Sequence, residues 1–453
     1  MKFTQKLKQT TVLMAATILS ACSLVMYKPI GTINQVNLDK GYRQKNVIAE
    51  SAKDGNLVIM MFSGGGTRAA SLGYGVLEQL KNVKVKTSSK GDTLLENIDI
   101  VYGVSGGSVL AAYFALEGKD VIPKFANRFL KQNFQKDIIA EAFSLSNLPR
   151  LSSPQFGRGD LLQERLNFTL YRGKTFGELV KNRKGPFAII SATDMNIGQK
   201  FTFTQETFDG LCLNLNDLEI ARAVAASSSV PLIFSPLTLN NNGDNCNFTM
   251  PKEFAVREEM VDGLVVKNIE ETKHILNLYQ DSKERPFIHL VDGGLTDNLG
   301  LASVLDISDV IGVDEVYKRA VQLGVKNVVV INVNAQNEVV SEMDKSANIP
   351  GLTDVVNTII NVPIDKTTQI TLHRYRQFTD QWNEYADKQA NKIEMHFVNL
   401  GLKALPDGEL KQDVLNIGTS FYLPETDVDK LRKAARILLA QSEEYKQALK
   451  ALQ

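Results

Sequence analysis

The sequence Gly-Val-Ser-Gly-Gly at residues 103–107 decides how this chain is interpreted. A short apolar run at residues 98–102 precedes it and predicts a buried strand, and an almost uniformly apolar run follows it and predicts a helix. A serine between glycines at a strand-to-helix turn is typical of a nucleophile elbow. Gly103 and Gly107 let the backbone bend and keep side chains away from the hydroxyl. We therefore predict that Ser105 is a nucleophile.

A glycine-rich turn lies about forty residues earlier. Residues 57–62 are a strongly apolar run that predicts a buried strand, and they lead directly into Ser-Gly-Gly-Gly-Thr-Arg at residues 63–68. Gly64, Gly65 and Gly66 expose backbone N–H groups with no side chain in the way, as in an anion-binding turn. A phosphate-binding loop is disfavoured because no Gly-Lys-Ser/Thr ending follows. Beside a nucleophile elbow, the loop is better interpreted as an oxyanion hole.

A candidate base follows a third apolar run. Residues 286–291 predict a buried strand, and Asp292-Gly293-Gly294 comes directly after it. An aspartate at the carboxyl end of a strand faces the ligand-binding edge of an open α/β sheet. Asp292 is therefore placed to deprotonate Ser105 directly. Asp262-Gly263 has the same dipeptide but no comparable strand before it.

These three segments, in this order, resemble the patatin-like phospholipases. That family combines a D/S-G-G-G-x-R loop, a GxSxG elbow and a D-G-G/A motif, and it uses a Ser–Asp dyad instead of a triad. Ser63 stands where the family often has aspartate, and Ala69 where it often has glycine; neither change removes a catalytic group. The resemblance spans roughly residues 56–335, including the stretches 191–204 and 221–232.

The resemblance implies lipid acyl hydrolysis on a membrane lipid, with no cofactor. Ser105 would attack an acyl ester, and Asp292 would take the serine proton and return it to the leaving alcohol. The backbone N–H groups of Gly65 and Gly66, in the loop that starts at Gly64, would hold the oxyanion. We assign Arg68 to holding this loop in shape, with contact to an anionic head group or a surface salt bridge as alternatives.

Two other interpretations stay open at this point. One is an α/β-hydrolase with a Ser–Asp–His triad, for which Ser105, Asp292 and then His373 or His396 have the appropriate order. Neither histidine lies in a loop after a predicted strand, which disfavours this class. The other is a catalytically silent lipoprotein that uses the same fold for binding.

The N-terminus has the pattern of a bacterial lipoprotein signal. Three lysines precede a short apolar run at residues 12–20, too short to span a bilayer, and Leu-Ser-Ala-Cys follows at residues 19–22. We predict that residues 1–21 are removed and that Cys22 carries lipid chains anchoring the protein to a membrane. Because Ser23 and not aspartate follows, we expect the outer membrane, facing the periplasm of the cell envelope.

The charge balance excludes several partners. The full chain has 51 basic and 51 acidic residues, and removal of residues 1–21 leaves 48 basic and 51 acidic ones. A nearly neutral chain lacks the excess positive charge that would bind nucleic acid or attract anionic lipid strongly. Residues 22–53 are polar and irregular, and we expect them to form a tether. Protein partners are not predicted.

Two cysteines remain in the mature chain. In an oxidising compartment Cys212 and Cys246 favour one disulfide bond, with two buried thiols as the alternative. Metal binding is not expected, because two cysteines without clustered histidines do not make a site.

The alternation of strands and helices predicts an α/β fold. It persists from about residue 56 to 334 and indicates a mostly parallel central sheet with helices on both faces, in a hydrolase domain over residues 54–340. Residues 119–184 interrupt the alternation as a mainly helical lid or cap. Residues 341–453 are expected to be a mainly helical C-terminal extension, packed on the core or forming a separate unit that touches the membrane.

Overall fold

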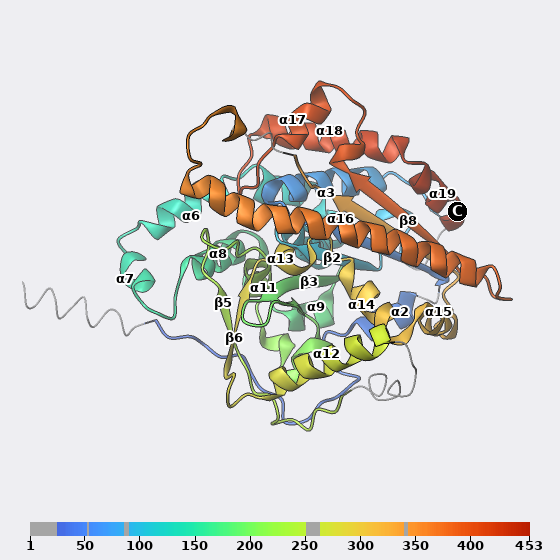
Figure 1. The fold of residues 1–453 in the computed structure, drawn as a ribbon, viewed down its shortest axis with the longest axis horizontal. Helices are drawn as coiled ribbons and strands as arrows, with labels where there is room; N and C mark the ends of the chain where they lie inside the picture. The colour runs from blue at the N-terminus through green and yellow to red at the C-terminus, as the bar shows by residue number, and fades with distance from the viewer. Residues whose placement is uncertain (1–24, 52–53, 86–89, 251–262, 339–342) are drawn as a thin grey trace, which may run out of the picture.

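A mixed β-sheet runs through the centre of the molecule. The computed structural model describes residues 25–51, 54–85, 90–250, 263–338 and 343–453. Within these ranges eight strands form one sheet: β1 (Asn56–Phe62), β2 (Ile100–Val104), β3 (Phe187–Asp194), β4 (Gln199–Thr202), β5 (Leu237–Asn240), β6 (Phe287–Val291), β7 (Asn327–Asn334) and β8 (Glu394–Gly401). Their order is β5-β6-β3-β2-β1-β7-β8, with β4 beside β3 (Figure 1).

The helices connect and cover these strands. In chain order they are α2 (Gln44–Ser51), α3 (Gly66–Leu80), α4 (Gly106–Glu117), α5 (Val121–Phe125), α6 (Phe134–Ala142), α7 (Leu148–Leu151), α8 (Arg158–Leu166), α9 (Phe176–Asn182), α10 (Gln205–Gly210), α11 (Ile220–Ser227), α12 (Gly263–Gln280), α13 (Gly294–Asp297), α14 (Ala302–Ile311), α15 (Val313–Gln322), α16 (Leu352–Ala386), α17 (Glu409–Leu415), α18 (Glu425–Gln441) and α19 (Glu443–Leu452).

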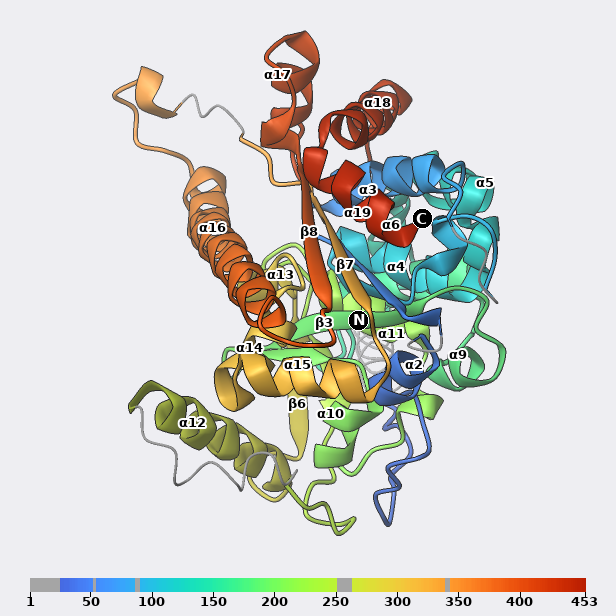
Figure 2. The ribbon, with the colours of Figure 1, turned by 90° about the vertical axis from the view of Figure 1, so that its right-hand side faces the viewer.

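Helices lie on both faces of the sheet. Figure 2 shows α3, α4, α18 and α19 on one side of the β7–β8 edge and α16 on the other. The central strands are buried on both faces, which is why residues 57–62 of β1 and 328–331 of β7 are uninterrupted apolar runs. The expected α/β fold, with a central sheet between helices and a largely helical C-terminal part, is confirmed.

Strand direction differs from the expectation on one side of the sheet. The five strands β3, β2, β1, β7 and β8 are parallel neighbours, whereas β4, β5 and β6 join through antiparallel pairings. The strand that ends before Asp292 therefore runs against its neighbour β3. It still delivers Asp292 to the correct edge, because the carboxyl ends of β3 and β6 meet: Thr193 pairs with Val291.

The segment expected to be a tether packs on the domain from residue 25 to residue 51. Tyr42 is 1% exposed, its ring stacks on Phe187 at 4.0 Å between centroids, and its hydroxyl donates to Ala188 O. Arg43 forms a buried ion pair with Asp209 at 2.8 Å. This part of the chain is therefore integral to the fold. The predicted signal at residues 1–21 and Cys22 lie outside the described residues.

The C-terminal part completes the sheet. Strand β8 pairs in parallel with β7 along its whole length, so the sheet continues across the predicted domain boundary at residue 340. Helix α18 lies against α3, where Arg432 forms an ion pair of 2.8 Å with Glu78. The described part of residues 341–453 thus packs on the core formed by the preceding residues.

Candidate active site

Ser105 occupies a sharp turn between β2 and α4. Its backbone has φ +51°, an uncommon value for a residue with a side chain, and α4 begins at the next residue. The residue is 4% exposed. Its N–H donates to Ser227 Oγ over 2.9 Å, and that hydroxyl in turn donates to Ser191 O. The turn has the geometry of a nucleophile elbow, in which strain presents the hydroxyl at the end of the sheet.

The register of three strands brings Asp292 into the same row as Ser105. Val104 at the end of β2 pairs with Ser191 of β3, and Val291 at the end of β6 pairs with Thr193. Extending both registers by one residue places Ser105 and Asp292 on the two sides of the same β3 residue. The two side chains therefore emerge at one edge of the sheet.

Asp292 is a buried carboxyl group with spare bonding capacity. Its Oδ1 accepts from Gly294 N–H at 2.8 Å, whereas Oδ2 is buried without a hydrogen bond of ordinary geometry from any described residue. Burial raises the pKa of Asp292 from 3.8 to about 6, and the Ser105 hydroxyl and Gly294 N–H partly oppose this rise. A carboxyl group of this kind suits a base that works near neutral pH.

The glycine loop and the elbow touch backbone to backbone. A Cβ atom on Gly106 would lie 2.0 Å from Gly66 O, and one on Gly107 would lie 2.4 Å from Phe62 O. A Cβ on Gly64 would lie 3.5 Å from the Cβ of Ser105. Only glycine permits this approach, which sets the loop against the nucleophile.

The N–H groups of the loop have different partners. Gly64 N–H donates to Asn298 O at 3.0 Å and is therefore committed to holding the loop. Among the described residues, Gly65 N–H and Gly66 N–H donate no hydrogen bond, and both glycines have positive φ values, +131° and +60°. Of the three N–H groups that the sequence suggests, those of Gly65 and Gly66 therefore remain the candidate oxyanion donors.

The sequence model of the patatin-like phospholipase family matches residues 60–305, more than half of the chain. The chain belongs to this family. The matched region contains the glycine loop, the elbow and the Asp-Gly-Gly motif at residues 292–294. No curated protein matches the sequence.

Several solved structures resemble this chain. Human GIVD cytosolic phospholipase A2 is 12% identical, with a TM-score of 0.45, over 93% of this chain and 68% of that chain. The same human enzyme in complex with methyl gamma-linolenyl fluorophosphonate is also 12% identical, with a TM-score of 0.43, over 94% of this chain and 67% of that chain.

Arg68 joins the glycine loop to two distant segments of the chain. The side chain is 3% exposed, and its Nε and Nη1 donate to Ala335 O at 2.8 Å and Ile417 O at 2.7 Å. Burial lowers its pKa to about 10, while the charge of Asp365 partly opposes the shift. These contacts favour the loop-supporting role over a surface salt bridge.

The four histidines make no hydrogen bond with Ser105 or Asp292 in the described structure. His373 is exposed on α16, and His289 is exposed on β6, where its Nδ1 faces Thr238 Oγ1 at 3.2 Å. His396 lies in β8 and has a pKa lowered by burial. This arrangement disfavours the Ser–Asp–His alternative.

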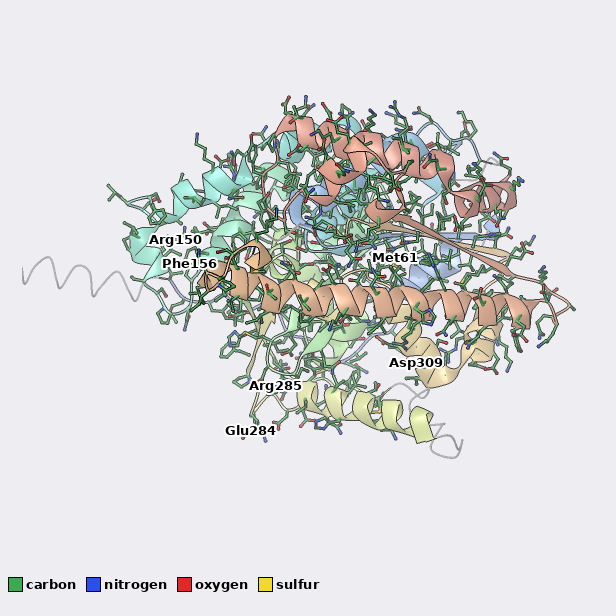
Figure 3. All side chains as sticks on the ribbon, turned by 45° about the horizontal axis from the view of Figure 1, so that its top comes forward. Met61, Arg150, Phe156, Glu284, Arg285 and Asp309 are labelled. Carbon is green, nitrogen blue, oxygen red and sulfur yellow. A yellow bond between two sulfur atoms is a disulfide. The ribbon has the colours of Figure 1, made fainter. Side chains whose placement is uncertain are left out.

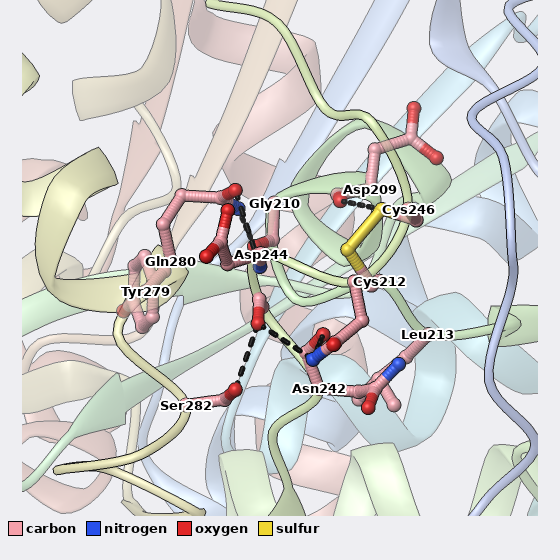
Figure 4. The surroundings of a disulfide bond; sticks show 12 residues. Asp209, Gly210, Cys212, Leu213, Asn242, Asp244, Cys246, Tyr279, Gln280 and Ser282 are labelled. Carbon is pink, nitrogen blue, oxygen red and sulfur yellow. Dashed lines mark hydrogen bonds between the residues drawn. A yellow bond between two sulfur atoms is a disulfide. The ribbon is translucent and has the colours of Figure 1, made fainter.

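The cysteines at positions 212 and 246 are bonded to each other. Cys212 and Cys246 form a disulfide whose surroundings Figure 4 shows. Cys212 O accepts from Ile33 N–H and Cys246 O from Val36 N–H, so the bond lies beside the N-terminal segment. Among the described residues, no group of three or more His, Cys, Asp or Glu side chains is arranged to hold a metal ion.

Sequence reasoning missed three residues that hold the site together. Ser227 binds the N–H of Ser105, Asn298 O binds the N–H of Gly64, and Ser63 Oγ accepts from Ala335 N–H. Ser227 stands in a stretch that resembles the family, but a run of serines gives no hint of a partner 122 residues away. Asn298 follows Asp292 by six residues, and only the fold brings it back to the glycine loop.

Proposed function

We propose that this chain hydrolyses acyl esters of membrane lipids through a Ser105–Asp292 dyad. The observation that carries the proposal is a strained, buried serine in the same row of the sheet as a buried carboxyl group whose Oδ2 is free to accept a proton. Membership of the patatin-like phospholipase family supports lipid as the substrate class.

The reaction has two acyl-transfer steps. Ser105 Oγ attacks the ester carbonyl while Asp292 takes its proton, and the proton passes to the leaving alcohol as the acyl-enzyme forms. Water then attacks the acyl-enzyme, Asp292 removes a proton from that water, and Ser105 regains its hydrogen as the fatty acid leaves. Gly65 and Gly66 N–H stabilise the negative oxygen in both steps.

We further propose that lipid chains on Cys22 anchor the enzyme in the bacterial cell envelope, on the periplasmic side of the outer membrane. Leu-Ser-Ala-Cys at residues 19–22 supports the assignment. No helix among the described residues is long and apolar enough to cross a membrane.

The dyad is tested with a soluble monomeric ester and a fluorophosphonate probe. The probe should label the wild-type protein at Ser105 and should not label Ser105→Ala. Ser105→Ala and Asp292→Asn should each abolish hydrolysis, and the double variant should be little worse than either, because groups acting as a unit give losses that do not add. Wild-type turnover by Asp292→Asn would contradict the mechanism.

Histidine variants separate the dyad from a triad. His373→Gln and His396→Gln should retain most of the activity, since a carboxylate base needs no imidazole. A loss of several orders of magnitude in one of them, with unchanged stability, would favour the triad.

The anchor is tested by mass analysis of the mature N-terminus and by fractionation of cells that produce Cys22→Ser. An unmodified Cys22 in the mature wild-type protein would refute the lipoprotein assignment.

A further inference from the structure

Large apolar side chains project into solvent where α6 meets α7. Ile139 and Phe143 lie one turn apart along α6 and its end, and Leu145 and Leu148 follow within five residues. Phe143 is 77% exposed and Leu145 is 90% exposed. A soluble protein rarely leaves such a group uncovered unless it binds a partner or a membrane.

The described chain begins beside this corner. Val25 O accepts from Ser153 Oγ at 2.9 Å, and Tyr27 N–H donates to Gln155 Oε1 at 2.8 Å, two and four residues after α7. Cys22 precedes Val25 by three residues, which span at most about 11 Å when fully extended. Lipid chains on Cys22 would therefore hold the α6–α7 corner close to the bilayer.

The catalytic edge of the sheet faces the same end of the molecule. In Figure 1, α6, α7 and the start of the described chain lie at the left end, toward which β8 runs from the end of α16, so the carboxyl ends of the parallel strands point that way. Figure 3 shows Arg150 and Phe156 at this end, with Asp309 toward the other.

Two further exposed apolar residues lie close to Asp292. Leu232 and Ile233 are 66% and 53% exposed, and Leu232 O accepts from Arg158 Nη2 at the start of α8. Three residues before Leu232, Ser229 O accepts the N–H of Asp292 at 2.9 Å. The turn at residues 229–233 therefore carries exposed apolar side chains at one end and holds the backbone of Asp292, the proposed base, at the other.

The first turns of α16 present an apolar stripe. Leu352, Val355, Ile359 and Val362 are all exposed, and their spacing of three and four residues places them on one face of the helix. The opposite face turns toward the site, where Ile364 lies near Gly294 and Thr368 hydrogen-bonds to Asn298. The helix thus separates the candidate active site from an apolar surface that no described residue covers.

Two arginines near the corner are already paired. Arg150 binds Glu164 and also lies over the ring of Phe156, 4.1 Å from its centroid, while Arg165 binds Asp137. With both arginines paired, the exposed apolar residues are the groups best suited to contact a surface, and apolar insertion is favoured over attraction to anionic head groups.

We propose that the α6–α7 corner, the 232–233 turn and the first turns of α16 form a docking face that rests on the lipid bilayer and presents lipid to Ser105. This proposal rests on the proposed function for its orientation, because the anchor at Cys22 selects the end of the molecule that meets the membrane. Half of the exposed large apolar side chains in the described structure belong to these three segments, together with Ile349 just before α16.

Contact with the bilayer is tested by quenching of tryptophan fluorescence. The chain has one tryptophan, Trp382, which is 2% exposed. Full-length Leu145→Trp, held in phosphatidylcholine vesicles with brominated acyl chains, should be quenched well beyond the wild-type level. Leu323→Trp, at an exposed position after α15, should match the wild type. Absence of quenching at Leu145→Trp, or equal quenching at both positions, would overturn the proposal.

The role in substrate delivery is tested with two matched double variants. Phe143→Ser with Leu145→Ser should lower hydrolysis of vesicle lipid by at least about tenfold, because two apolar side chains lose their lipid contacts, while hydrolysis of a soluble monomeric ester stays unchanged. Ile307→Ser with Leu323→Ser, on α14 and after α15, should change neither rate. Equal loss on both substrates, or no loss on vesicles, would contradict the docking role.

The measurements keep the two proposals apart. Absence of monomeric-ester hydrolysis in the wild type would refute the proposed function, whereas quenching needs no catalysis and judges the docking face alone. A vesicle-free dimer that dissociates in Phe143→Ser would assign the corner to a second copy of the chain and overturn the proposal.

Discussion

The backbone N–H of Ser105 donates to the side-chain oxygen of Ser227 over 2.9 Å. Ser227 ends α11, and its carbonyl accepts the N–H of Gly293, the residue after the proposed base. One residue therefore binds the backbone at Ser105 and next to Asp292, the two members of the proposed dyad. Because β2 and β6 lie on opposite sides of β3, the end of α11 is hydrogen-bonded to the ends of both strands. These bonds hold Ser105 and Asp292 at a fixed distance from each other.

Ser227→Ala should reduce turnover without weakening substrate binding. The variant leaves the buried N–H of Ser105 without its acceptor, at a cost of about 1–3 kcal/mol in the free energy of unfolding. Because the strained turn then relaxes, we expect kcat to fall by about 10- to 100-fold with KM nearly constant, measured on a monomeric ester.

Two control variants accompany Ser227→Ala. Ser227→Thr keeps the hydroxyl and should recover much of the rate. Ser229→Ala removes only a hydroxyl bonded to Ala225 O and keeps the carbonyl that holds Asp292, so its kcat should stay near the wild-type value. A parallel fall in both alanine variants would contradict a specific positioning role.

Gly66→Ala should disrupt the oxyanion loop. A Cβ at this position would lie 2.4 Å from Ser420 O, and the backbone has φ +60°. Either the loop or the segment at Ser420 must shift, which displaces the oxyanion donors relative to Ser105, so kcat should fall by about a hundredfold or more. Gly418→Ala is the matched control, because no atom lies within 4 Å of its added Cβ. A raised KM with unchanged kcat would instead indicate a packing role.

The three turns that follow β1, β2 and β6 could be predicted from the sequence, because at each of them an apolar run is followed by glycines. Strands β1, β2 and β6 end where those runs end, at Phe62, Val104 and Val291. The buried residues of β1 and β2 form continuous stretches, whereas β6, expected to be a buried strand, alternates and leaves Phe287 and His289 exposed. The glycines mark the turns that follow these strands. The residue types at the candidate site follow from the same signals, although their catalytic roles stay predictions.

The direction of β6 and the packing of residues 25–51 could not be predicted in this way. A strand has the same pattern whichever way it runs, so only its pairing with β3 shows that β6 is antiparallel. Tyr42 and Arg43 stand in a polar stretch without periodicity, and they are buried through Phe187 and Asp209, far along the chain. Long-range partners of this kind leave no local signal.

Removal of the disulfide should lower stability and leave catalysis intact. Cys212 and Cys246 are 34 residues apart, and closing a loop of that length stabilises a protein by about 4 kcal/mol in the chain-entropy estimate. The variant with both cysteines changed to serine should show this loss in denaturant unfolding, while monomeric-ester hydrolysis at low temperature stays near wild type. Dithiothreitol should destabilise the wild type and leave the double variant unaffected.

The rate of ester hydrolysis should depend on the ionisation of Asp292. Burial raises the pKa of this carboxyl group to about 6, and only its ionised form can accept the Ser105 proton. We therefore expect kcat/KM to be constant above pH 7 and to fall about tenfold per pH unit below pH 6. The measurement is a pH series from 4.5 to 8 on a monomeric ester. A rate that stays constant down to pH 4.5 would contradict Asp292 as the base.

The same carboxyl group should destabilise the folded protein at neutral pH. Its pKa is about 6 when folded and 3.8 as the ordinary value, so between these values the folded state holds a proton that the unfolded state has lost. Stability therefore falls as pH rises from about 4 to 6, by a total on the order of 3 kcal/mol.

Asp292→Asn carries no charge at any pH and avoids this loss. It should unfold at higher denaturant concentration than the wild type at pH 7, and the gain should disappear near pH 4. Ser105→Ala keeps the carboxyl group and serves as the inactive control, with a pH dependence of stability like that of the wild type. A lower stability of Asp292→Asn at pH 7 would mean that the carboxylate is stabilised in the fold, and that the raised pKa does not hold.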